Sequence, residues 1–212
     1  MNRWPLLLGL NLSVLVALVC SGLSPHDRAT WALEVAPAVI AAPILWMTGK
    51  RYPITTLLYI LIAAHMLVLI LGGTYTYARV PLGFWLQDLF HLSRNPYDKI
   101  GHFMQGLVPA MVAREVLLQR GDLSHRGMTA FLSICVAMAI SAVYELLEWW
   151  TALAIGQGAD AFLGTQGDPW DTQSDMFLAL IGAVVGMVLL ARWQDRQMRG
   201  FAVTWRRSLA LN

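Results

Sequence analysis

The feature that most constrains this chain is a series of long apolar runs, each about as long as a bilayer is thick. A helix needs roughly 20 apolar residues to cross the hydrocarbon core of a membrane. The chain is 57% hydrophobic and 13% charged, and that charged fraction is about half of what a soluble domain carries. We therefore expect an integral membrane protein. Its net charge of +2 is too small to indicate a nucleic-acid partner.

The expected fold class is all-α. Backbone groups in lipid must be hydrogen-bonded within the protein, and no alternating strand pattern recurs along the chain. We predict a single integral membrane domain over residues 1–212, a polytopic bundle of about six transmembrane helices. The predicted spans are 4–23, 31–47, 53–72, 100–118, 128–150 and 175–190, followed by a basic tail over 191–212.

Lys and Arg residues divide unevenly between the alternate loops of this six-span arrangement. One side carries Arg3, Lys50, Arg51, Arg120, Arg126 and the five arginines of the tail. The other side carries fewer, chiefly Arg28, Arg79 and Arg94. Basic loops stay in the cytoplasm, so both termini are predicted to be cytoplasmic. The acidic loops would then face the periplasm of a bacterial inner (plasma) membrane, and the basic tail would contact anionic membrane lipids.

The loop between the third and fourth spans is predicted to contain a short amphipathic helix. Its apolar residues recur at helical spacing, and they are Leu82, Trp85, Leu86, Leu89 and Phe90. Such a helix lies at the membrane interface or, because it is short, packs as a lid over the bundle.

The stretch from Asn95 to Gln105 carries an acid, an imidazole and an amide into the start of the fourth span. Asp98, His102 and Gln105 are spaced i, i+4, i+7, so a helix places them on one face. Ionisable side chains at the edge of a membrane span are costly and usually functional. This face is therefore the first candidate for a site.

Two further acidic pairs reach the same side of the membrane. Glu145 and Glu148 lie near the outer end of the fifth span, and Asp171 and Asp175 lie at the start of the sixth. The Gly182–Gly186 motif continues the Asp175 face and would allow a neighbouring helix to pack closely on it. The carboxylates are therefore expected to point into the bundle. The alternative use of the glycine motif is a homodimer.

Several carboxylates in one partly desolvated site repel one another, so positive charge or bound protons must compensate them. A divalent metal such as zinc, iron or manganese is one solution, with ligands drawn from His102, Glu145, Asp171 and Asp175. Lys99 and Arg94 offer a second solution without a metal. Protons shared in a carboxylate relay are a third.

Other polar residues in the spans are weaker candidates. His65 could complete the ligand set, but we expect it to hydrogen-bond within the bundle. Glu34 could be an extra ligand or simply solvated. Arg114 and Glu115 are expected only to pair and to reach the cytoplasmic surface.

The most specific motifs resemble those of a known family. The motifs are Tyr97–Phe103, Tyr144–Trp150 and Gly164–Asp168, followed by Asp171, Asp175 and Met176. They look like those of the YjdF-type bacterial inner-membrane proteins, and the resemblance covers the whole chain. It implies a multipass inner-membrane protein and leaves its reaction open.

A more distant similarity is to VanZ-like proteins. Their pattern is Asp-Lys-x-x-His-Phe, a glutamate on the next helix, and an aspartate that opens a glycine-bearing helix. The residues that fit are Asp98, Lys99, His102, Phe103, Glu145, Asp175, Gly182 and Gly186. The tryptophans after Glu148 and the missing asparagine on the last helix depart from it. The VanZ name is linked to glycopeptide-antibiotic tolerance, which by analogy implies a role in the cell envelope.

Three functions follow from these observations. The first is an outward-facing hydrolase or transferase acting on a lipid or cell-envelope substrate, with His102, Asp175 and Glu145 binding a metal or polarising water. Glu148 or Asp98 would be its general base. The second is a small transporter or proton-coupled carrier, and the third is a scaffold whose polar cluster locks the helices. The enzyme is favoured because the acids cluster on one side without an inverted repeat, and because buried charge is a poor source of stability.

Overall fold

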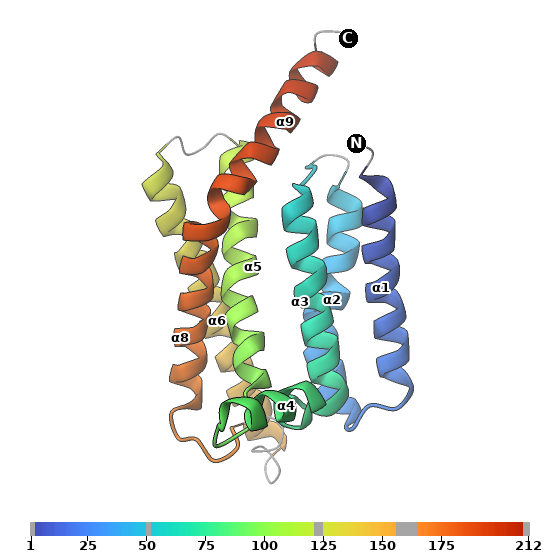
Figure 1. The fold of residues 1–212 in the computed structure, drawn as a ribbon, viewed down its shortest axis with the longest axis vertical. Coiled ribbons are helices and arrows are strands. Elements are labelled where there is room, and N and C mark those ends of the chain that lie inside the picture. Colours follow the sequence, from blue (N-terminus) through green and yellow to red (C-terminus); the bar gives the residue numbers. More distant parts are fainter. Residues whose placement is uncertain (1–2, 50–51, 121–124, 156–164, 210–212) are drawn as a thin grey trace.

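The computed structural model describes residues 3–49, 52–120, 125–155 and 165–209, and every regular element in these ranges is a helix (Figure 1). The predicted all-α fold class is therefore confirmed. Lys50, Arg51, Gly164 and residues 210–212, which the sequence analysis used, lie outside the described ranges.

The described part of the chain contains six long helices in the bundle. They are α1 (Trp4–Leu23), α2 (Arg28–Thr48), α3 (Thr56–Tyr75), α5 (Tyr97–Arg120), α6 (Arg126–Ile155) and α8 (Asp171–Val185). A 3-10 turn, η1 (Tyr77–Arg79), and the short helix α4 (Pro81–Phe90) lie between α3 and α5. After α8 a π-helical turn, η2 (Gly186–Leu190), leads into α9 (Ala191–Leu209).

Within the described ranges, five helical stretches are long and apolar enough to cross a membrane. They are Trp4–Leu23, Arg28–Thr48, Thr56–Tyr75, Arg126–Ala154 and Asp171–Gly200. The sixth long helix, α5, has 24 residues and is about 36 Å long, but it is less apolar than these five stretches. It packs against α3, α6 and α8 in the middle of the bundle (Figure 1). Its charged residues Asp98, Arg114 and Glu115 are buried there.

The helices form two groups that meet along α3 and α5. One group is α1, α2 and α3, and the other is α5, α6 and α8 (Figure 1). The start of α1 and the C-terminal end of α9 lie at one end of the bundle, which we call the α9 end. Helix α4 lies across the opposite end, which we call the α4 end.

Local capping sets where several helices begin and end. Asp27 accepts a hydrogen bond of 2.7 Å from the backbone N–H of Thr30 and caps α2. That hydrogen bond holds the pKa of Asp27 below its usual value. Thr55 caps α3 in the same way, and α3 ends where Thr76 adopts a left-handed conformation with φ 57°.

Glycines allow α5 and α8 to pack closely. A Cβ on Gly106 would overlap the backbone of Ala179, and a Cβ on Gly182 would overlap the carbonyl oxygen of Phe103. Gly186 lies against the side chain of Met111. The predicted close packing on the Gly182–Gly186 face is therefore confirmed, and its partner is α5 of the same chain. A homodimer stays a prediction that needs another surface.

Helix α4 lies where the sequence predicts the short interfacial helix. Most of its large apolar side chains are exposed, namely Leu82, Phe84, Trp85, Leu89 and Phe90. They do not pack over the bundle, so the interfacial helix is favoured over the lid. Its Gly83 packs against Asn95, whose side chain donates a hydrogen bond of 3.0 Å to the carbonyl of Val80 and accepts one from the N–H of Tyr97. Asn95 thereby ties α4 to the start of α5.

Candidate functional site

His102 lies at the centre of a cluster that three helices build at the α4 end. Its Nε2 is 3.4 Å from Oδ1 of Asp98, one turn earlier on α5. The same nitrogen is 3.8 Å from Oδ2 of Asp175 on α8, and Nδ1 is 3.7 Å from Oε1 of Glu145 on α6. The structure therefore brings together residues that the sequence placed on three separate spans.

Gln105 decides which nitrogen of His102 is available. Its Oε1 lies 2.9 Å from Nδ1 of the ring. Because a carbonyl oxygen only accepts hydrogen bonds, Nδ1 carries the hydrogen in this arrangement. Nε2, which faces Asp98 and Asp175, then carries a lone pair when the ring is neutral and a second N–H when the ring is protonated. A second partner that sets the tautomer in this way is typical of metal-binding histidines.

Among the residues that the structure describes, two groups of side chains have ligand atoms close enough to hold a metal ion. The first is Asp98, His102 and Asp175, and the second is His102, Glu145 and Glu148. Within each group the atoms lie within 4.8 Å of one another. The hydrogen bond to Gln105 favours the first group, because it leaves Nε2 free on that side. Glu145 and Glu148 then lie beside the candidate ion on the neighbouring helix.

Two carboxylate oxygens of the cluster are buried without a hydrogen-bond partner among the described residues. They are Oδ1 of Asp175 and Oε1 of Glu145. Asp175 is only 2% exposed and Glu145 only 8%. Buried polar atoms are nearly always satisfied, and an unsatisfied charged oxygen is especially costly. A cation in the first group would compensate the charge of Asp175, and a cation in the second would compensate that of Glu145.

Arg94 supplies positive charge to a neighbouring pair of acids rather than to His102. It binds Asp168 at 2.8 Å and Asp171 at 2.7 Å, and it also donates to the carbonyl of Thr165. Lys99 forms no ion pair with the described acids. Arg94 therefore offsets Asp168 and Asp171, whereas no described Lys or Arg forms an ion pair with the acids around His102. The ligand role of Asp171 stays a prediction.

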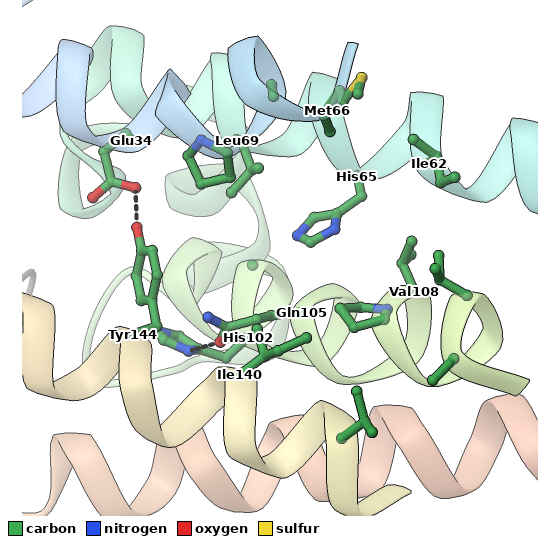
Figure 2. A pocket seen from close by; sticks show the side chains of 18 of the residues that line it. Glu34, Ile62, His65, Met66, Leu69, His102, Gln105, Val108, Ile140 and Tyr144 are labelled. Carbon is green, nitrogen blue, oxygen red and sulfur yellow. Dashed lines mark hydrogen bonds between the residues drawn. The ribbon is translucent and has the colours of Figure 1, made fainter. Parts of the chain in front are cut away.

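A cavity of about 440 Å³ begins at this cluster and runs between α2, α3, α5 and α6 (Figure 2). Asp98, His102 and Glu148 line one part of it. Most of the remaining lining is apolar, and it continues along α5 to Val112 and Ala113. The cluster is therefore accessible from inside the bundle through an apolar chamber of the size that binds small molecules.

Two residues of this chamber have more definite roles than the sequence suggested. Tyr144 donates a hydrogen bond of 2.9 Å to Oε2 of Glu34 (Figure 2). Glu34 is 4% exposed, so the second of its two alternatives, a solvated carboxylate, is excluded. The signal for Glu34 was an acid inside an apolar span. Tyr144 gave no separate signal, because a tyrosine near a span end is normally an interfacial residue.

His65 also differs from expectation. Its ring lies at the cavity, and its Nε2 is buried without a hydrogen-bond partner among the described residues (Figure 2). The hydrogen bond predicted within the bundle is therefore not found for that nitrogen.

A second polar cluster lies at the α9 end and is fully hydrogen-bonded. Glu115 accepts from the N–H and hydroxyl of Thr55 at 2.6 and 2.7 Å and from Gln194 at 2.9 Å. Arg114 donates to Gln194 at 2.8 Å and to Asp195 at 2.6 Å. Both charged residues are buried, so the predicted reach to the surface is wrong, and the ion-pair partner of Arg114 is Asp195. This network joins α3, α5 and α9, which gives it a structural role.

Comparisons with known proteins agree with the sequence motifs. The family described as "Predicted membrane protein (DUF2238)" matches residues 6–196. The chain is 56% identical over 200 residues to the inner membrane protein YjdF of Escherichia coli (strain K12), covering 94% of this chain and 96% of that protein. No solved structure matches the chain. The YjdF-type resemblance is confirmed, and the VanZ-like similarity stays a prediction. The chain therefore belongs to the DUF2238 family of predicted membrane proteins.

Proposed function

We propose that this protein is an enzyme of the bacterial inner membrane, a metal-dependent hydrolase or transferase that acts on a lipid or cell-envelope substrate. Its metal is held by Nε2 of His102 with the carboxylates of Asp98 and Asp175. The observation that carries the proposal is the buried, unsatisfied carboxylate oxygen of Asp175 beside His102, whose Nε2 faces both Asp98 and Asp175.

The chemistry of these donors supports a transition metal. Imidazole nitrogen favours zinc and iron, whereas carboxylate oxygens favour manganese and magnesium. One imidazole with two carboxylates therefore suits zinc, iron or manganese. A divalent ion supplies Lewis-acid polarisation of a substrate oxygen.

Glu148 is placed to act as the general base. It belongs to the cluster around His102, and it also lines the cavity from which substrate and water would arrive. Asp175 and Glu145 do not line that cavity, so they lie behind the site. A carboxylate on the open side can take a proton from an attacking water or hydroxyl, whereas the residues behind it hold and orient the ion.

The site is assigned to the outer side of the membrane because of the basic residues at the opposite end. Arg3, Arg126 and the arginines of α9 lie toward the α9 end, and basic ends of spans stay in the cytoplasm. The inner membrane is assigned because the YjdF relative is named an inner membrane protein.

The test is elemental analysis of purified protein that was never exposed to a chelator. We expect close to one transition-metal ion per chain in the wild type and loss of that ion in His102→Ala and Asp175→Ala. His26→Ala is the matched control, because His26 is an exposed histidine at the same end of the bundle and should retain the ion. Wild-type protein without metal, and without thermal stabilisation by added Zn²⁺, Mn²⁺ or Fe²⁺, would overturn the metal site and favour the transporter or scaffold.

A second variant separates metal binding from catalysis. Glu148→Gln should retain the ion and lose turnover, because the amide cannot accept a proton. The readout is mass spectrometry of lipids and envelope precursors after incubation with metal-loaded proteoliposomes. A Glu148→Gln protein that turns over the substrate found with the wild type would remove Glu148 from the mechanism.

A further inference from the structure

We propose that the cavity holds an acyl chain of the substrate, and that this lipid enters sideways from the bilayer between α2 and α6. The inference rests on the proposed function, because it places the polar head of the lipid beside His102. It names the substrate class as an acylated membrane lipid rather than a water-soluble envelope precursor.

The first support is the polarity of the cavity along its length. Its ionisable residues gather toward the α4 end, where Asp98, His102 and Glu148 lie. Farther along α5 the lining becomes apolar with Val108, Pro109, Val112 and Ala113. A chamber that is charged at one end and apolar at the other matches an amphiphile, whereas a sugar or a peptide would leave its polar groups unpaired in the apolar part.

The second support is the length of the cavity beyond His102. From His102 to Val112 the helix rises about 15 Å. One leaflet of the hydrocarbon core is about 15 Å thick. The cavity is therefore deep enough for the full length of an acyl chain whose headgroup lies at the level of His102.

The third support is where the cavity meets the surface of the protein. Ile44 on α2 and Val136 and Ile140 on α6 all line it, yet they are 54%, 42% and 44% exposed. These residues belong to helices that are apolar enough to cross a membrane, so their exposed side chains face lipid. The hydrogen bond between Tyr144 and Glu34 joins the same two helices nearer the α4 end. An acyl chain can therefore enter between α2 and α6 on the α9 side of that bond.

His65 is the positioning residue for the region between headgroup and chain. It lies on α3, across the cavity from His102 and Gln105, and its unpaired Nε2 is buried there (Figure 2). An imidazole with an unpaired nitrogen can hydrogen-bond to the ester linkage of an acyl lipid. A lipid with that linkage would satisfy an atom that is otherwise costly to bury.

The experiment is photocrosslinking in proteoliposomes with a phosphatidylglycerol that carries a diazirine near the end of one acyl chain. We expect crosslinks in the α5 segment 108–113 of wild-type protein, competed by unlabelled lipid. Ala41→Trp should abolish them, because Ala41 lines the cavity and an indole would fill it. Ala42→Trp is the matched control, because Ala42 is exposed and lies outside the cavity lining. Crosslinks confined to lipid-facing positions, or unchanged by Ala41→Trp, would overturn the proposal.

The same samples keep this inference separate from the proposed function. Metal content is measured on each preparation. A wild-type protein that binds metal but shows no cavity crosslink refutes the acyl-chain site alone. Cavity crosslinks in a protein that binds no metal support the acyl-chain site and refute the metal enzyme.

The proposed hydrogen bond between His65 and the ester linkage of the lipid is tested separately. Wild-type protein should retain an ester-linked lipid about fivefold better than its ether analogue, because the ether lacks the carbonyl acceptor. His65→Leu should lose that preference, and His65→Gln should restore part of it through its amide donor. Equal retention of the two lipids by the wild type would overturn the contact.

Discussion

The hydroxyl of Tyr144 donates a hydrogen bond of 2.9 Å to the buried carboxylate of Glu34, and this bond joins α6 to α2 at the α4 end. At the α9 end, Glu115 on α5 binds Thr55 at the start of α3. The two groups of helices are therefore tied near both ends, and the cavity lies between them.

Removing the hydroxyl of Tyr144 should destabilise the contact between α6 and α2. Tyr144→Phe leaves the buried carboxylate of Glu34 without its donor, and the expected loss of stability is about 1–3 kcal/mol. Thermal unfolding in detergent of Tyr144→Phe, Glu34→Leu and the double variant checks this. The double variant should lose less stability than the sum of the two single variants, whereas simple additivity would show that the bond is not coupled.

The α5–α8 crossing should tolerate no side chain at Gly182. Gly182→Leu would drive a side chain into the backbone of α5, and we expect destabilisation of at least about 1–3 kcal/mol. Gly9→Leu is the matched control, because a Cβ on Gly9 of α1 meets no atom within 4 Å. The amount of folded protein after detergent extraction and its thermal midpoint are the readouts. Equal midpoints for the two variants would contradict the packing.

The two arginines that bind Asp195 should differ sharply in importance. Arg114 binds it at 2.6 Å with its side chain 6% exposed, whereas Arg126 binds it at 3.2 Å with its side chain 76% exposed. Arg114→Met breaks a buried pair and should cost about 3–5 kcal/mol. Arg126→Met should cost about 0–1 kcal/mol, because exposed ion pairs contribute little. Chemical denaturation in mild detergent compares them, and equal losses would refute the structural role of the buried network.

Substitutions of Asp171 and Asp175 should have different effects on the metal content of the protein. Asp175 faces Nε2 of His102, whereas Asp171 is bound by Arg94. Asp175→Asn should lose the ion, and Asp171→Asn should retain it while weakening the attachment of the segment that begins at Thr165. Elemental analysis and limited proteolysis are the two readouts. Loss of metal from Asp171→Asn would restore Asp171 to the ligand set predicted from the sequence.

The sequence by itself determined the features that depend on local spacing. Apolar runs of membrane length predicted an all-α bundle, and helical periodicity predicted α4 and the shared face of Asp98, His102 and Gln105. The Gly182–Gly186 motif predicted a close helix contact on the Asp175 face. These inferences succeeded because bilayer thickness and the helical repeat act on neighbouring residues, so a single stretch of chain contains the whole signal.

Only the tertiary structure decided which residues meet across helices. Glu34 and Tyr144 are 110 positions apart, and Arg94 and Asp171 are 77 apart. Whether such pairs meet depends on how far each helix is rotated and where it crosses its neighbours, and α5 and α8 set that for the site through their glycine contacts. As a result, Arg94 binds Asp168 and Asp171, and His102 lies among acidic side chains at the cavity. Spacing along one helix cannot contain that information, because it arises from the packing of several.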